Sequence, residues 1–224
     1  MNEADTGRAI TAYLAAHPSL PRSDICYTTK LRDNNTSRAV VRASITKSLK
    51  ASGLDAIDLF LLHSPIGGPE ARRASWAAVE DAVLAGEVRL AGVSNFGVRH
   101  LDELMGWDDL RVKPVVNQIE VHPFSVQKDI RAACDRWGIV VQAYSPLVAG
   151  MRFGHPVLKE VAAKYGVSEA QVLVRWSVQH GFVTLPKSAK VERIVANADV
   201  GGFEISEGDM ARLDGLDEKL VTDW

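Results

Sequence analysis

Side chains capable of acid–base or stacking chemistry stand directly after short apolar runs of the sequence. Lys30, His63 and Tyr144 each follow such a run. A lysine ammonium stabilises negative charge, a histidine donates hydrogen bonds or carries a proton, and a tyrosine offers a flat aromatic face. Each also has a simpler interpretation, as a solvated lysine, a structural histidine or a core tyrosine. Their shared position after apolar runs favours a common site if the runs are strands.

A second chemical grouping follows the last apolar run. Lys187, Ser188 and Arg193 place two cations and a hydroxyl within a short stretch. Groups of this kind can surround one anion such as a phosphate. Charges near the start of a helix are also common on an ordinary solvated surface, so this grouping alone leaves both interpretations open.

The elements that position these residues alternate between short apolar runs and longer amphipathic runs. The expected strands are Ile25–Thr29, Ile57–Leu62, Val88–Val93, Pro114–Ile119, Ile139–Ala143 and Phe182–Leu185. The expected helices include Glu3–Leu14, Ser37–Lys50, Glu70–Ala85 and Ser168–Gln179. Strands that are apolar on both faces and alternate with helices predict a parallel sheet covered by helices.

The pattern favours a closed α/β barrel over a doubly wound sheet, because no Gly-rich dinucleotide turn follows any expected strand. We therefore predict a (β/α)8 barrel of TIM type. Such a barrel has eight strands, and the sequence supplies about six, so we expect an incomplete barrel. Asn2 is a candidate helix cap, and the helix over Glu3–Leu14 has no strand before it. The deficit is therefore expected at the first β-α-β unit.

Composition excludes several classes of protein. The chain has 224 residues, 46% of them hydrophobic, and a formal net charge of -2. These values predict a single domain over residues 1–224 and no nucleic-acid or other polyanion partner. No apolar run is long enough for a membrane span, and the polar N-terminus is unlike a secretory signal. Cys26 and Cys134 are expected to be buried free thiols in a cytoplasmic protein.

Seven stretches together resemble the NADP-dependent aldo-keto reductases. They are Asn2-Glu3 with Gly7–Ile10, Thr28–Leu31, Asp58–Pro65, Gly92–Phe96, Asn117–Pro123, Ala143–Leu147, and Leu185–Ser188 with Arg193 and Asn197. Their order and spacing along most of the chain carry the resemblance. It implies reduction of aldehyde or ketone carbonyls to alcohols by hydride transfer from NADPH, with a small carbonyl compound as substrate.

The resemblance assigns catalytic roles to two residues of this sequence. Lys30 matches the lysine whose ammonium lowers the pKa of an acidic tyrosine, and His63 matches the histidine that orients the substrate carbonyl. The cofactor-binding residues that it implies are Ser94, Asn95, Gln118, Tyr144, Ser145, Leu147, Lys187, Ser188, Arg193 and Asn197. Tyr144 would stack on the nicotinamide, and Lys187 and Arg193 would favour NADP over NAD. Ala196 stands where the family often has an acidic adenine contact. No metal site is expected.

The family's catalytic tyrosine would stand two residues before Asn2, and its aspartate earlier still, so neither is in this sequence. Tyr13 lies in a helix, Tyr27 should face the helices, and Tyr144 is assigned to the nicotinamide. We therefore expect severely reduced activity in this chain. The alternatives are a non-catalytic NADP-binding or regulatory protein and an unstable fragment. Self-association through open barrel edges is a further expectation.

Overall fold

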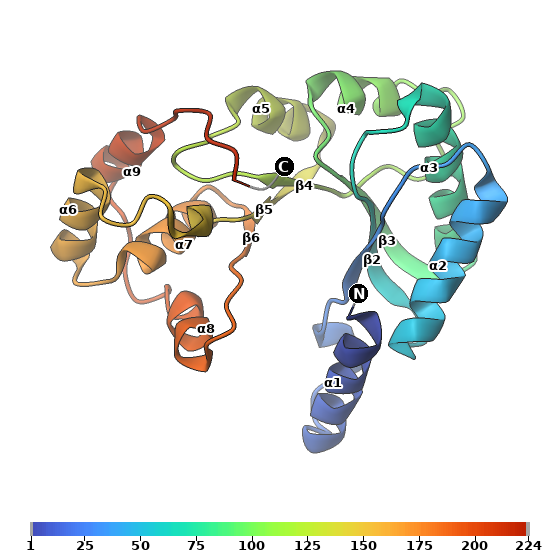
Figure 1. Ribbon diagram of the computed structural model, residues 1–224, viewed down its shortest axis with the longest axis horizontal. Coiled ribbons are helices and arrows are strands. Elements are labelled where there is room, and N and C mark those ends of the chain that lie inside the picture. The colour runs from blue at the N-terminus through green and yellow to red at the C-terminus, as the bar shows by residue number, and fades with distance from the viewer. Residues whose placement is uncertain (1, 223–224) are drawn as a thin grey trace. The chain divides into compact units, whose positions relative to one another are not determined.

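The computed structural model describes residues 2–222, which divide into two compact units, one up to Asn117 and one from Gln118 onward. Figure 1 labels the elements of both units. The first unit contains α1 (Glu3–Ala16), η1 (Arg22–Asp24), β1 (Thr28–Leu31), α2 (Arg38–Ser52), β2 (Ile57–Leu62), α3 (Gly68–Leu84), β3 (Val88–Ser94) and α4 (Val98–Met105). Strand β4 (Val116–Glu120) begins in the first unit and ends in the second.

The second unit continues with a run of helices and two strands. These are α5 (Lys128–Trp137), β5 (Val140–Tyr144), η2 (Val148–Gly150), α6 (Pro156–Tyr165), α7 (Glu169–Gln179), β6 (Val183–Leu185), α8 (Val191–Ala198) and α9 (Glu207–Asp214). The alternation of strands with helices is the one that the sequence predicts.

Strand pairing in both units is parallel. In the first unit β2 lies between β1 and β3, with Lys30 opposite Leu61 and Leu62 opposite Val93. In the second unit β5 pairs with β6, with Tyr144 opposite Leu185. Parallel strands in register end at the same edge of a sheet, so the residues that follow them share one end of each unit.

Strand β2 forms the centre of the first unit. Its six residues are all buried, and none exceeds 6% exposure. A strand covered on both faces must be apolar throughout, which explains the unbroken run Leu59–Leu62. Leu59 and Leu61 of β2 pack with Val115 and Val116, and the buried Trp76 of α3 donates its indole N–H to the carbonyl of Val112 at 3.1 Å.

Asp58, the one polar residue of β2, is bonded by the segment before β1 and by Arg89 of β3. The Asp58 carboxylate accepts hydrogen bonds from Arg22 at 2.5 Å, from Arg89 at 2.8 Å and from the backbone N–H of Tyr27 at 2.9 Å. Burying a carboxylate is unfavourable unless donors satisfy it, and here three do. The same contacts fix where β1 begins.

The first strand lies further along the sequence than predicted. The sequence predicts Ile25–Thr29, whereas β1 spans Thr28–Leu31. Ile25 closes the η1 turn by donating its N–H to Arg22, and Tyr27 gives its N–H to the Asp58 side chain. Neither group is then available to the ladder. The other five strands lie within one or two residues of their predicted ranges.

The N-terminus of α1 and one of the two cysteines differ from what the sequence predicts. Asn2 occupies the N-cap position of α1, but its side chain makes no capping hydrogen bond. The prediction of two buried thiols is wrong for Cys26, which is exposed, and right for Cys134. Cys26 lies between the η1 turn and β1, outside the sheet, so its apolar neighbours in sequence do not bury it.

Among residues 2–222, no helix combines the length and the apolar character needed to cross a bilayer.

Helix α1 lies against α2 through a glycine, and this contact generates a stability prediction. A Cβ at Gly7 would stand 1.7 Å from the carbonyl oxygen of Ser52, which is backbone and cannot give way. We expect Gly7→Ala to lower the free energy of unfolding by about 2–3 kcal/mol, because the added atom must push the helices apart. Urea denaturation measures the loss. Ala12→Ser, on the exposed side of α1, is the control, and equal stability of both variants would contradict the prediction.

Candidate active site

The first unit gathers four of the predicted residues at the carboxyl ends of β1, β2 and β3. Lys30 is half-buried in β1, and His63 is exposed directly after β2. The backbone N–H of His63 donates to the carbonyl of Leu31 at 3.1 Å, which extends the β1–β2 pairing past the end of β2. Since Leu31 adjoins Lys30, the two predicted catalytic residues lie on neighbouring strand ends of one unit.

Asn95 joins the ends of β2 and β3. Its side-chain amide donates to the carbonyl of His63 at 3.0 Å and to the hydroxyl of Ser94 at 3.2 Å. Asn95 has a φ of 61°, a left-handed conformation that asparagine adopts more readily than most residues. Ser94 is buried beside it. His63, Ser94 and Asn95 are thus linked by hydrogen bonds.

Asn117 supports this group, and the sequence reasoning assigned it no role of its own. Its side-chain oxygen accepts from the N–H of Phe96 at 3.3 Å, and its amide donates to the carbonyl of Phe96 at 2.8 Å. This pair of bonds holds the loop that carries Asn95. The available signal was a polar residue directly after the apolar run Pro114–Val116.

The second unit places Gln118 and Tyr144 on neighbouring strands. Gln118 of β4 donates its amide to the Gln142 side chain of β5 at 2.5 Å, and both residues are buried. Gln142 and Tyr144 are two residues apart in β5, so they share a face of the strand. Gln142 is a further residue that the sequence reasoning missed, and its role is to orient Gln118.

The loop after β5 has a strained backbone. Ser145, Val148 and Ala149 have φ values of 48°, 54° and 50°. Positive φ is costly for residues with a Cβ and most unusual for a β-branched valine. The loop is closed by hydrogen bonds from Val148 to Ser145 at 2.9 Å and from Gly150 to Leu147 at 2.8 Å. Strain of this type concentrates at ligand-binding loops, and Ser145 and Leu147 are predicted cofactor contacts.

The predicted anion-binding residues follow β6. Lys187 and Arg193 are exposed, Ser188 is half-buried, and α8 begins at Val191. Ser188 accepts the N–H of Lys190 at 3.1 Å, which shapes the turn into α8. Two exposed cations beside a helix N-terminus suit a phosphate group, because the exposed N–H groups of the first turn add positive potential. Asn197, four residues after Arg193, is buried.

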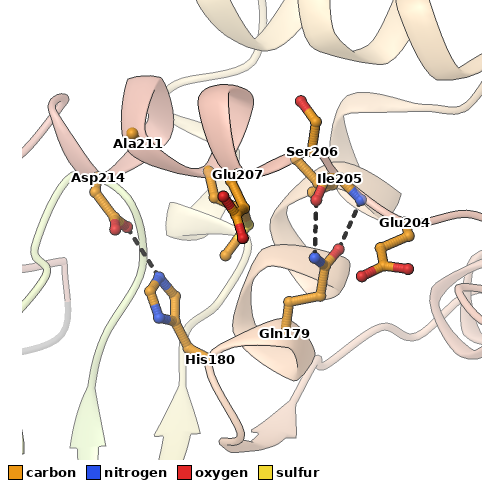
Figure 2. A pocket seen from close by; sticks show the side chains of 9 residues that line it. Gln179, His180, Glu204, Ile205, Ser206, Glu207, Ala211 and Asp214 are labelled. Carbon is orange, nitrogen blue, oxygen red and sulfur yellow. Dashed lines mark hydrogen bonds and ion pairs between the residues drawn. The ribbon is translucent and has the colours of Figure 1, made fainter.

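A pocket in the second unit contains none of the predicted residues (Figure 2). It is lined by the end of α7 and by residues of the segment that leads into and through α9. His180 bonds Asp214 at 2.9 Å and Arg131 at 3.0 Å, and Trp176 donates to Asp214 at 2.8 Å. These side chains satisfy one another, so we assign them to the packing of α7 against α9.

No group of acidic, histidine or cysteine side chains within residues 2–222 could hold a metal ion.

Tyr27 lies on the side of β1 that meets α1, as its alternation with Lys30 predicts. Thr29, on the same side, donates its hydroxyl to Glu3 of α1 at 2.8 Å. Burial raises the pKa of Tyr27 most, the Glu3 carboxylate raises it further, and the Thr29 hydroxyl opposes them. A catalytic tyrosine needs the opposite shift, so Tyr27 is unsuited to that role.

The titration of Tyr27 can be measured directly. The phenolate absorbance of Tyr27 is the difference between the wild-type chain and the Tyr27→Phe variant. This difference should develop above pH 10.0, the ordinary pKa of tyrosine, because the buried phenol resists ionisation. Stability should therefore fall as pH rises above that value, where the unfolded chain ionises first. Tyr13→Phe, an exposed site, should keep the late-titrating component. A difference curve centred at or below pH 10 would refute the assignment.

Comparison with known proteins gives a consistent result. The model of the aldo/keto reductase family matches residues 2–218. An uncharacterized oxidoreductase of Schizosaccharomyces pombe is 46% identical over 223 residues, covering 100% of this chain and 79% of the relative. Glyoxal reductase of Bacillus subtilis is 41% identical over 197 residues, covering 88% of this chain and 70% of the enzyme.

Solved structures support the same relationship. An aldo-keto reductase named MGS-M4, from a Medee basin deep-sea metagenome library, superimposes with a TM-score of 0.89 at 32% identity, covering 98% of this chain and 79% of that one. An aldo/keto reductase of Brucella melitensis gives 0.87 at 33% identity, covering 96% and 80%. The likeness confirms the predicted (β/α)8-type fold, of which the described residues form six strands. On the family match and these relatives, the chain belongs to the aldo/keto reductase family.

Proposed function

We propose that this protein is an NADP-dependent oxidoreductase that acts on small aldehydes or ketones. The observation that carries the proposal is the row of polar residues that follow the parallel strands of each unit. Lys30, His63 and Asn95 follow or end strands of the first unit, and Tyr144 and Lys187 do so in the second. In barrels of this type the carboxyl ends of the strands carry the chemistry. A relative named for glyoxal makes a small aldehyde a suitable test substrate.

In the proposed reaction two residues of this chain act on the carbonyl group. NADPH, when bound, supplies the hydride to the carbonyl carbon. His63, which is exposed at the end of β2, would donate a hydrogen bond to the carbonyl oxygen and fix its direction. In this chain the proton would come from water, and the Lys30 ammonium would stabilise the negative charge that the water acquires as it gives the proton to the carbonyl oxygen. Asn95 donates to the His63 carbonyl and so joins the ends of β2 and β3.

The chemistry of the cofactor-side residues fits an NADP molecule. Tyr144 offers an aromatic face for the nicotinamide ring, while hydroxyl and amide groups match its carboxamide. Ser94, Asn95 and Gln118 supply these groups. Ser145 and Leu147 would contact the pyrophosphate, and the strained loop over residues 145–150 would expose its backbone N–H groups to it.

The 2'-phosphate is proposed to bind Lys187, Ser188 and Arg193, with Asn197 at the adenine. Lys187→Ala or Arg193→Ala should weaken NADPH binding roughly tenfold, because each removes a charge-assisted hydrogen bond to phosphate. NADH binding should change little, since NADH has no 2'-phosphate. Calorimetry with both nucleotides measures the difference. Lys128→Ala, an exposed lysine of α5, is the control. Equal loss for NADPH and NADH would refute the assignment.

We also propose that turnover of the 224-residue chain is low. Among its described tyrosines, Tyr27 has a pKa shifted in the wrong direction, and Tyr144 is assigned to the nicotinamide. With glyoxal and NADPH, the rate should be about 10²–10⁴-fold below that of the Bacillus subtilis glyoxal reductase, the factor that a positioned acid contributes. Loss of NADPH absorbance measures it. Tyr27→Phe should not change the residual rate, and a rate equal to that of the relative would disprove the proposal.

A second candidate function is NADP binding without catalysis. It is favoured by the contrast between ten predicted cofactor contacts and only two predicted catalytic residues, Lys30 and His63. Both candidates predict NADPH binding. Turnover above that of a Lys30→Met, His63→Ala double variant supports the enzyme, and binding with no turnover supports the second candidate.

Exposed apolar side chains support a proposal of self-association. Val183 and Leu185 of β6 and Val191, Ile194 and Val195 of α8 are all exposed in the second unit. An edge strand with apolar neighbours commonly pairs with another chain. Sedimentation velocity over a range of concentrations should show dimers, and a monomer throughout would contradict this.

A cytoplasmic location is proposed from the two free cysteines.

A further inference from the structure

The last described residues of the chain return to the loop that follows β4. Figure 1 shows this segment in red near β4. Phe124 accepts hydrogen bonds from the N–H groups of Glu218 at 3.2 Å and Leu220 at 2.9 Å. The Asp217 side chain in turn accepts the N–H of Val126 at 3.3 Å. Residues 217–222 therefore run along residues 120–126, all within the second unit.

Glu120, the last residue of β4, closes this contact. Its carboxylate is buried and accepts the N–H of Thr222 at 3.0 Å to each oxygen. The hydroxyl of Thr222 donates to the same carboxylate at 2.6 Å. The two residues stand 102 positions apart in the sequence, so the contact depends on the tertiary structure.

His122 completes the surroundings of the carboxylate. Its Nε2 lies 3.0 Å from Glu120 Oε1, and the imidazole is fully buried. Burial lowers the pKa of His122, although the carboxylates of Glu120, Asp217 and Glu218 oppose this shift. The lowered pKa favours the neutral ring, whose Nε2–H then donates to Glu120. A neutral imidazole supplies one hydrogen bond and no charge, so the carboxylate depends on Thr222 for its remaining donors.

The position of Glu120 relates this contact to the proposed site. Gln118 and Glu120 are two residues apart in β4 and therefore share a face of the strand. Gln118 is held by Gln142, and Glu120 holds the end of the described chain. A buried carboxylate with three donors at the carboxyl end of a strand fixes residues 217–222 beside that end.

We propose that Glu120 is a positioning residue, a carboxylate latch that holds residues 217–222 at the end of β4. Resting on the proposed function, the latch also sets the approach of the carbonyl substrate without touching it. Arg152 strengthens the far end of the segment through its ion pair with Glu218 at 2.6 Å. The segment is thus tied at Thr222 by a buried contact and at Glu218 by a partly exposed one.

Amide hydrogen exchange tests the latch independently of activity. Glu120→Gln and Thr222→Val should accelerate exchange at residues 218–222 about tenfold or more, because each weakens hydrogen bonds to a charged acceptor. Thr222→Ser keeps the hydroxyl and should retain the protection. Glu204→Gln, an exposed carboxylate of the same unit, is the control. Unchanged exchange in both test variants would overturn the latch, and Thr222→Val decides the matter if Glu120→Gln does not fold.

The substrate part of the proposal is tested by steady-state kinetics with glyoxal. Both test variants should raise KM several-fold, with kcat and NADPH affinity little changed, because a displaced segment alters access rather than chemistry. A parallel loss of kcat, or an unchanged KM with accelerated exchange, would overturn this part. If the chain shows no turnover and no NADPH binding, the proposed function fails, while the exchange result still decides the latch.

Discussion

The parallel pairing of β2 is the constraint on which the first unit depends. Because β2 is buried on both faces, its residues other than Asp58 are apolar, and its two neighbours run parallel to it and are connected to it by helices. Register then fixes which residues meet at the carboxyl end. A shift of one residue would move Lys30 to the opposite face of β1 and separate it from the strand end that carries His63. The location of the candidate chemistry therefore follows from a purely apolar requirement.

Buried polar groups near these strand ends satisfy one another. Asn117 binds the backbone of Phe96, Gln118 binds Gln142, and Glu120 binds Thr222. Each such group would be costly if left without a partner, so the network restricts the loops to few conformations. The strained φ angles in the loop after β5 persist for the same reason, since the surrounding bonds fix them.

Family membership and the residues of this chain constrain its chemistry in different ways. The family match indicates an oxidoreductase, and the cationic residues after β6 suit a phosphorylated nucleotide. The proposed reaction also needs a proton donor. Tyr27 shows why a nearby tyrosine does not automatically supply it: burial and Glu3 both favour the neutral phenol. Burial and charged neighbours thus shift the pKa of a tyrosine away from the value that an acid catalyst needs.

The sequence by itself determined the alternation of strands and helices, the parallel sheet and the polar residues after the strands. These follow from local apolar periodicity and from motif spacing, which a linear chain displays directly. Only the tertiary structure decided the start of β1, because Asp58 takes the N–H of Tyr27 from a distance of 31 positions. The same holds for the exposure of Cys26, the positive φ of Val148 and the bond between Glu120 and Thr222. The Tyr27–Asp58 and Glu120–Thr222 bonds join residues far apart in the sequence, and no local pattern records such a neighbour.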